Sequence, residues 1–416
     1  MSERGRARAV LFLQGPISPF FQRIAERLVA ADPKIRALRI NLCFGDRMFW
    51  RRPGAVDYRG RAEDWPRFIE AFIVKEGVSE LVLLGEQRDY HRAAIKAAQR
   101  HGVDVIATDF GYLRPDWITF ELDGLGGASR FPRDPAAIRA VAAASPDLDR
   151  TPRYRDPFWR QALLDMAYHL ASSFLWFLYP HYRSHLPDHP IATYLGSGLR
   201  LLLQRRRARA ATAEIVAAEA RAGETFLFPL QIARDFSLRA YSRFPNLETP
   251  IREVIASFAQ HAAADARLIV KVHPLDPGLK SWRRVVAAAA RQCSVADRVI
   301  YIDGGDLARL VAASAGVVVV NSTVGLLSLQ MGAPTIALGQ AVYDVPGMTA
   351  RHGLDAFWRA PPRPDMGLVG DFLKAMAGAF MVRGTFYSEP GLTSGVEAAT
   401  ARLLERSVNL PRLAAE

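Results

Sequence analysis

The sequence is poor in cysteine. Its 416 residues include two, Cys43 and Cys293, and neither stands in a Cys-x-x-Cys or Cys/His spacing. A disulfide framework and a zinc site are therefore not expected, and a reducing compartment is the simpler interpretation. The chain also lacks an uncharged apolar run of about 18 residues, so no membrane-spanning helix is expected. The apolar run Ala9 to Leu13 is too short for the hydrophobic region of a signal peptide, and we interpret it as a buried strand.

Several motifs of nucleotide and metal chemistry are missing as well. No GxGxxG pattern begins at Gly15, and the sequence contains neither GxxxxGK[ST] nor HExxH. We interpret the acidic, glycine-rich run Asp303 to Asp306 as a turn rather than a metal site. The sequence therefore favours a mechanism without a metal and without a bound cofactor. No internal repeat or low-complexity tract is present.

The composition is that of a folded protein with a basic surface. Half of the residues are hydrophobic and 23% are charged, which excludes a disordered or fibrous class. The length predicts about two to three domains. The net charge of +12 suits an anionic partner, such as nucleic acid, phospholipid or a nucleotide-activated substrate. Because arginine outnumbers lysine throughout, an ordinary solvated surface explains much of this excess equally well.

The first part of the chain, residues 1–150, has the rhythm of a parallel α/β domain. Short apolar runs alternate with amphipathic helical patterns such as Asp89 to Arg100, which is typical of a doubly wound sheet. The predicted strands are Ala9 to Leu13, Ile35 to Asn41, Glu80 to Leu84 and Val103 to Ala107.

Residues 151–222 differ from both flanking regions because they are rich in aromatic residues and arginine, including Arg205-Arg206-Arg207. We expect helices and no strand here. One interpretation is a helical linker packed on both domains. The other is contact with an anionic membrane surface, where aromatic rings lie at headgroup depth and arginines meet acidic lipids.

A second α/β pattern occupies residues 223–363, and an amphipathic helical tail follows at 364–416. Two Rossmann-like doubly wound domains joined by a linker form the architecture called GT-B in glycosyltransferases. The strands predicted in the second domain are Thr225 to Pro229, Arg267 to Val272, Val299 to Ile302, Gly316 to Val320 and Thr335 to Leu338.

Polar motifs follow two strands of the second domain. His273-Pro274 comes directly after a strand, where proline holds the imidazole at the edge of the sheet and an N–H of the ring can bind a phosphate oxygen. Lys271 lies on the same strand face, which favours an anion site. After four consecutive valines, Asn321-Ser322-Thr323 either caps a helix or offers hydroxyl and N–H groups to a phosphate, and both roles can coexist.

A carboxylate stands at the equivalent place in the first domain. Asp109 follows a predicted strand and precedes Gly111, so it is either a nucleophile or base, or a residue that forms the turn. Glu121 is a nearby second carboxylate. Arg114 is a candidate to orient one of them or to bind a carboxylate of an acidic sugar.

In these motifs the chain resembles the capsular-polysaccharide β-Kdo transferase family of Gram-negative bacteria, and more closely its single-module members, which start the poly-Kdo linker on a phospholipid. The matching segments extend in order from about residue 9 to 350. They are Leu11 to Phe21, Asn41, Gly45-Asp46, Trp65, Gly85 to Arg88, Tyr90-His91, Gly111 to Thr119, Glu121, Pro229 to Gln231, Lys271 to Pro274, Asn321 to Gly325, Gly339 and Tyr343 to Gly347.

The resemblance implies a retaining transferase that uses CMP-Kdo. In that family the His-Pro and Ser/Thr motifs hold the CMP phosphate, which implies this role for His273-Pro274 and Ser322-Thr323. We assign Lys271, Asn321 and Gln231 to the same site. The family's acidic-x-Gly motif falls on Asp109. Related modules often carry a second acidic residue before this glycine, and Phe110 stands there in this chain, so the nucleophile is Asp109 or Glu121.

The expected reaction is transfer of β-Kdo to a phosphatidylglycerol-type lipid by double displacement, on the cytoplasmic side of the inner membrane and in company with other capsule assembly proteins. Alternatives are transfer of another CMP-activated acidic sugar, extension of a polysaccharide, or a non-catalytic capsule-export scaffold. Nucleic-acid binding is not expected, because no base-stacking motif accompanies the positive charge.

Overall fold

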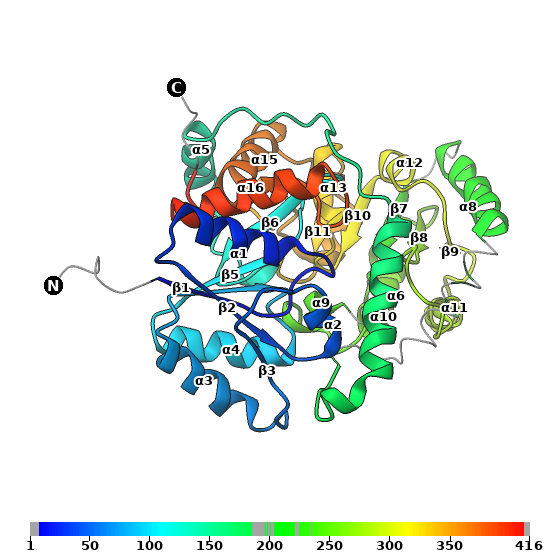
Figure 1. Cartoon of the computed structure of the whole chain (residues 1–416). Coiled ribbons are helices and arrows are strands. Elements are labelled where there is room, and N and C mark those ends of the chain that lie inside the picture. The colour runs from blue at the N-terminus through cyan, green and yellow to red at the C-terminus, as the bar shows by residue number, and fades with distance from the viewer. Residues whose placement is uncertain are drawn as a thin grey trace. The chain divides into compact units, whose positions relative to one another are not determined.

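The computed structural model describes residues 8–184, 196, 198, 200, 204–220, 224–233 and 235–411. The chain divides into two compact units, whose elements are labelled in Figure 1. The first unit comprises Met1–Phe131, Ala140–His185 and Leu373–Glu416, and the second comprises Pro132–Arg139 and Leu186–Phe372. Helices α5 (Pro135–Ala143) and α15 (Met366–Phe380) each contain a boundary between the two units.

The first unit is built on a seven-stranded sheet of order β12-β6-β5-β4-β1-β2-β3. Strands β1 to β5 are parallel, whereas β6 and β12 form an antiparallel edge. Their bounds are β1 (Ala9–Phe12), β2 (Arg36–Asn41), β3 (Ala55–Asp57), β4 (Glu80–Leu84), β5 (Asp104–Phe110), β6 (Trp117–Leu122) and β12 (Met381–Arg383).

Helices cover both faces of this sheet, as Figure 1 shows. On one face, α1 packs against α16, and Arg27 forms an ion pair with Glu397 at 2.8 Å. On the other face, α3 packs against α4 over apolar strand residues such as Leu81 and Val105. The helices of this unit are α1 (Phe20–Ala31), α2 (Phe44–Met48), α3 (Trp65–Glu76), α4 (Asp89–Arg100), η2 (Gly126–Ala128), α6 (Phe158–Phe174), η3 (Trp176–Leu178) and α16 (Gly391–Leu404).

The structure adds two segments to the first unit that the sequence-based prediction assigned elsewhere. The C-terminal segment is not only helical: it supplies β12, which pairs with β6, and α16, which packs against α1 and contributes to the same core. Residues 140–185 also belong to the first unit. Both segments join the first unit through contacts with residues that are distant in the sequence, and a local hydrophobic pattern does not predict such contacts.

The second unit has a parallel five-stranded sheet in the described residues, of order β11-β10-β7-β8-β9. Its strands are β7 (Thr225–Pro229), β8 (Arg267–Lys271), β9 (Val299–Ile302), β10 (Gly316–Val319) and β11 (Thr335–Ala337). Its helices are α8 (Gln204–Glu219), α9 (Phe236–Ala240), α10 (Glu248–His261), α11 (Trp282–Gln292), α12 (Leu307–Ala312), α13 (Val324–Gln330) and α14 (Gly353–Phe357). Both units are thus doubly wound α/β sheets, which confirms the predicted fold class.

The aromatic and basic region, residues 151–222, contains the helices α6, η3 and α8 and no strand among its described residues. The side chains of Arg205 and Arg206 lie outside the described residues, while Arg207 pairs with Asp303 at 3.2 Å. None of the described helices combines the length and the apolar character needed to span a bilayer.

Candidate functional site

The candidate donor site lies where three adjacent strands of the second sheet end. Strands β10, β7 and β8 are neighbours, and β7 is the middle one. Gln231, His273 and Asn321 each stand two residues after the end of one of these strands. The chain winds away from β7 first through β8 and β9 and then through β10 and β11, and ligands of such sheets bind at the carboxyl ends beside this reversal. The structure therefore brings these three predicted residues to one edge of the sheet.

Gln231 and Asn321 hydrogen-bond to each other across this edge. The buried Gln231 donates from Nε2 to Asn321 Oδ1 at 2.9 Å, and Asn321 donates from Nδ2 to the backbone oxygen of Ser237 at 2.8 Å. Ser237 Oγ lies 3.1 Å from Gln231 Nε2. The two amides thus hold the ends of β7 and β10 together and position the loop that follows β10.

His273 presents one N–H group. Its Nδ1 accepts a hydrogen bond from the backbone N–H of Leu275 at 3.1 Å, so the proton of the neutral ring lies on Nε2. Burial lowers the pKa of His273, and the positive charge of Lys271 lowers it further, against the opposing effect of Asp235 and Asp276. The imidazole is therefore neutral at neutral pH and can donate from Nε2. Pro274, which follows it, is exposed and has no backbone donor.

Lys271 supplies positive charge at the same strand end. It is buried, and burial lowers its pKa whereas the charge of Asp303 raises it. Asp303 directly follows β9 and also binds Arg200 at 2.6 Å and Arg207 at 3.2 Å. Asp303 thus interacts with three cations, with two arginines through ion pairs and with Lys271 through its charge, and this excess of positive charge suits an incoming anion.

Ser322 and Thr323 form the turn between β10 and α13. Ser322 Oγ accepts from the backbone N–H of Val324 at 3.2 Å, and the Ser322 carbonyl oxygen accepts from the hydroxyl of Tyr343. Thr323 is exposed and makes no side-chain capping hydrogen bond. Gly325 is required here because a Cβ on it would lie 2.3 Å from the Tyr343 hydroxyl. The helix cap predicted at Ser322-Thr323 is therefore replaced by a turn, which the hydrogen bond from the Val324 N–H to Ser322 Oγ stabilises.

In the first unit, Asp109 and Glu121 lie on the same face of the sheet. Asp109 pairs with Thr119 and Ala107 pairs with Glu121 in the antiparallel ladder of β5 and β6. Side chains two residues apart on a strand share a face, so the two carboxylates are diagonal neighbours. Asp109 is exposed at the end of β5, and its Oδ1 accepts from the Phe110 N–H at 2.7 Å. Glu121 is fully buried and accepts a hydrogen bond from Ser129.

Arg114 and Tyr112 contribute to the electrostatics of these carboxylates. The Arg114 guanidinium lies 5.0 Å from the centre of the Phe110 ring. Surrounding protein atoms lower the pKa of Arg114, and the negative charge of Asp109 opposes this. Burial raises the pKa of Tyr112, and the charge of Glu121 raises it further. Arg114 thus interacts electrostatically with Asp109, and its role as an orienting cation stays a prediction.

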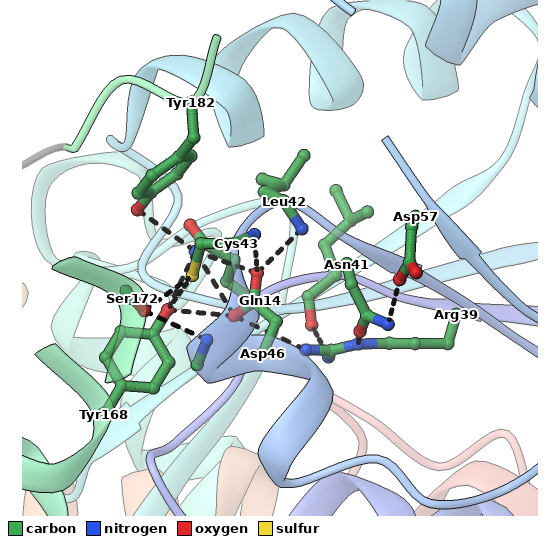
Figure 2. A network of polar contacts seen from close by, with 12 residues as sticks. Gln14, Arg39, Asn41, Leu42, Cys43, Asp46, Asp57, Tyr168, Ser172 and Tyr182 are labelled. Atoms are coloured by element: carbon green, nitrogen blue, oxygen red, sulfur yellow. Dashed lines mark hydrogen bonds and ion pairs between the residues drawn. The ribbon is translucent and has the colours of Figure 1, made fainter. Parts of the chain in front are cut away.

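A buried polar network that was given no role in the sequence-based prediction lies at the ends of β1 and β2. Figure 2 shows Gln14, Arg39, Asp46 and Tyr168 directed toward one another. Asp46 accepts from the Tyr168 hydroxyl at 2.9 Å, from Gln14 Nε2 at 3.1 Å and from the backbone N–H of Leu42 at 2.9 Å. Arg39 balances its charge at 3.6 Å. The carboxylate is fully hydrogen-bonded, so this network serves to attach α6 to the sheet.

A second buried group that was not assigned a role is His91 in α4. Its Nδ1 lies 2.7 Å from the backbone oxygen of Gly85, which directly follows β4 and has a φ of 67°. Burial lowers the pKa of His91 to about 3, and the charge of Arg88 adds to this effect. A neutral His91 therefore donates to Gly85 and stabilises the turn. In the sequence, the only signal for either group is its presence in the segments that carry the resemblance.

The remaining predictions for the site concern metals. Among the described residues no group of three or more His, Cys, Asp and Glu side chains is arranged to hold an ion. The metal-independent mechanism stays a prediction.

Comparison with known proteins places the chain in a family. The sequence profile of the family described as capsule polysaccharide biosynthesis protein matches residues 79–387. The capsule polysaccharide modification protein LipB of Neisseria meningitidis serogroup A is 29% identical over 390 residues, covering 92% of each chain. The capsule polysaccharide export protein KpsS of Escherichia coli is 27% identical over 389 residues, covering 91% of this chain and 96% of its own.

A solved structure gives a more distant likeness. KpsC of Thermosulfurimonas dismutans, a β-Kdo 2,7 transferase, is 13% identical with a TM-score of 0.45, covering 96% of this chain and 99% of its own. The family profile matches more than half of the chain, and the two curated relatives match nearly all of it. This protein therefore belongs to the capsule polysaccharide biosynthesis protein family.

Proposed function

We propose that the protein is a retaining glycosyltransferase that moves β-Kdo from CMP-Kdo to a phosphatidylglycerol-type lipid and so starts the linker of a capsular polysaccharide. Membership of a capsule biosynthesis family supports this proposal, as does the resemblance of the motifs to β-Kdo transferases. The observation that carries it is the meeting of Gln231, His273 and Asn321 at the point where the strand order of the second sheet reverses.

The phosphate of the donor binds at this edge. Neutral His273 donates from Nε2 to a phosphate oxygen, and Lys271 supplies the charge that attracts the anion. The hydroxyl of Thr323, an exposed residue, donates a further hydrogen bond. Gln231 and Asn321 act indirectly, because their amide groups hold the ends of β7 and β10 together. Binding at neutral imidazole and ammonium needs no metal ion.

Asp109 is the nucleophile. Its carboxylate is exposed, whereas Glu121 is buried and hydrogen-bonded to Ser129. In the first step an Asp109 oxygen bonds to the anomeric carbon as the bond from that carbon to the phosphate oxygen breaks, and CMP leaves with the electron pair. In the second step the acceptor hydroxyl bonds to the anomeric carbon and releases its proton to water, and Asp109 leaves as a carboxylate with the electron pair of the broken ester bond. Two inversions give retention. The Arg114 guanidinium, whose charge interacts with that of Asp109, is the cation that orients this carboxylate.

The acceptor places the reaction at the cytoplasmic surface of the inner membrane, with CMP-Kdo supplied from solution and other capsule assembly proteins receiving the product. The basic charge of the chain supports a location at an anionic surface.

The test is incubation with CMP-Kdo and a fluorescent phosphatidylglycerol analogue, followed by mass spectrometry of the lipid. A lipid heavier by one or more Kdo units, with CMP released in equal amount, is the expected result. Calorimetric binding of CMP without any turnover of CMP-Kdo would instead identify a non-catalytic scaffold. Transfer from another CMP-activated acidic sugar, but not from CMP-Kdo, would support the proposed mechanism and show that the proposed donor is wrong.

A further inference from the structure

Helix α6 is oriented with polar side chains toward the protein. Tyr168 donates to the buried Asp46, and Ser172 Oγ accepts from the backbone N–H of Gly45 at 3.0 Å. A Cβ on Gly45 would lie 2.4 Å from the Tyr168 ring, so helix α6 approaches the backbone of α2 closely. These contacts prevent the helix from rolling about its axis, because rolling would leave Asp46 buried without its partner.

The opposite side of α6 carries large apolar side chains that are exposed. They recur at intervals of three or four residues, which places them along one face of a helix. This face continues into η3. We call it the α6 stripe, and it consists of the half-buried Leu170 and of the exposed residues Trp159, Leu163, Met166, Phe174, Trp176 and Phe177.

The exposed fractions within the α6 stripe are large. They are 63% for Trp159, 55% for Leu163, 74% for Phe174 and 62% for Trp176. Single exposed apolar residues are common on proteins, but a contiguous row of this length marks an interaction site. The interior of its own unit cannot accept it, because the inward face of the helix is already held by the Asp46 network.

The residues around the α6 stripe favour a lipid surface. Tryptophan and phenylalanine are suited to the boundary between headgroups and acyl chains. Arg155 and Arg160 are exposed at the start of the helix, and the chain as a whole carries a net charge of +12. The acidic neighbours have protein partners: Asp156 accepts from the Tyr387 N–H at 3.3 Å and Asp165 lies 3.6 Å from His169. The charge at the start of the stripe therefore complements acidic lipids.

We propose that the α6 stripe inserts into the surface of a bilayer that contains anionic phospholipids, with Arg155 and Arg160 at the headgroups. The helix lies in the plane of the membrane and spans nothing. This inference deepens the membrane location proposed above by assigning it to named residues. It needs neither CMP-Kdo nor sugar transfer, so its failure and the failure of the proposed reaction are distinguishable.

The test uses the full chain, without donor, and vesicles of phosphatidylcholine with or without phosphatidylglycerol. Flotation measures partitioning, and lipids brominated in the acyl chains report contact by quenching tryptophan fluorescence. The double variant Trp159→Ser/Leu163→Ser should lower partitioning into anionic vesicles by about tenfold or more, because two apolar side chains no longer enter the bilayer. Val74→Ser is the matched control: Val74 is 59% exposed on α3 of the same unit and should have no effect.

Three outcomes would overturn the proposal. One is equal partitioning of the double variant and the native protein, with unchanged melting temperatures. Another is strong vesicle binding with no bromolipid quenching that depends on Trp159 and Trp176, tested in Trp→Phe variants. The third is a dimer or larger assembly that the double variant dissociates while vesicle binding is absent, which would assign the stripe to a second copy.

The headgroup contact has a test of its own. Arg155→Gln/Arg160→Gln should weaken binding to anionic vesicles and leave binding to neutral vesicles unchanged. An equal loss on neutral vesicles would contradict the headgroup role.

Discussion

Asp109 and Glu121 share one face of the first sheet, since Asp109 pairs with Thr119, which stands two residues before Glu121. Their environments separate them. Asp109 is exposed at the end of β5, whereas Glu121 has no exposed surface and accepts a hydrogen bond from Ser129. Two carboxylates at neighbouring positions therefore suit different roles, one accessible to a substrate and one within the fold.

We predict that Asp109→Asn lowers kcat for sugar transfer by about 10⁴-fold or more while the affinity for CMP and the melting temperature stay near those of the native protein. Glu121→Gln, the matched control, should keep transfer within about tenfold and reduce stability instead, because it alters a buried hydrogen bond. Trapping with CMP-Kdo in the absence of acceptor should place the sugar mass on the peptide that contains Asp109. A mass on the peptide with Glu121 would reverse the two roles.

We predict that His273→Ala weakens CMP binding by about 10- to 100-fold, because a hydrogen bond to a charged phosphate contributes about 1.5–3 kcal/mol. His273→Asn keeps a side-chain N–H donor and should recover part of the affinity. Calorimetry with CMP measures both. The control is His352→Ala, at an exposed histidine of the same unit, which should leave the affinity unchanged. Native affinity in a folded His273→Ala protein would remove His273 from the site.

We predict that His91 makes the stability of the fold depend on pH. Burial lowers its pKa in the folded state from 6.5 to about 3, so the unfolded chain binds the proton more readily. The contribution of His91 is fully present above about pH 6.5 and is lost as the pH falls toward 3, by about 2 kcal/mol between about pH 7 and pH 5. Urea unfolding across this range measures it.

His91→Asn provides the comparison, since asparagine does not titrate and can still donate to the Gly85 oxygen. The free energy of unfolding of this variant should fall less steeply with decreasing pH than that of the native protein. Parallel curves for the two proteins would contradict the assignment of the slope to His91.

We predict that Tyr168→Phe lowers the free energy of unfolding by about 1–3 kcal/mol, because a buried carboxylate, Asp46, loses a hydrogen-bond donor. Tyr179→Phe is the comparison: Tyr179 donates to Asp57 at 2.7 Å, but the Asp57 side chain is 20% exposed and water can replace the donor. Its loss should be smaller. Chemical denaturation measures the free energy of unfolding of the two variants. A larger decrease for Tyr179→Phe than for Tyr168→Phe would contradict the prediction that the Asp46 network contributes more to stability.

Much of the architecture could be predicted from the local pattern. The four apolar runs of the first half became β1, β2, β4 and β5, and the five of the second half became β7 to β11. Apolar strands alternating with amphipathic helices leave few arrangements other than a doubly wound parallel sheet. In such a sheet the residues after each strand gather at one edge, so the sequence also indicated that His273 and Asn321 would meet there, whereas Gln231 was assigned to the site with the resemblance.

The tertiary structure decided what depends on distant partners. The pairing of β12 with β6 joins segments more than 260 residues apart, Met381 opposite Thr119, and no local pattern encodes it. Burial separated Asp109 from Glu121, and the Leu275 N–H determined which nitrogen of His273 carries the proton. The sequence by itself determined which residues are apolar along α6. Only the contacts of Tyr168 and Ser172 decided that this apolar face points away from the protein, because a buried carboxylate must keep its hydrogen-bond donors.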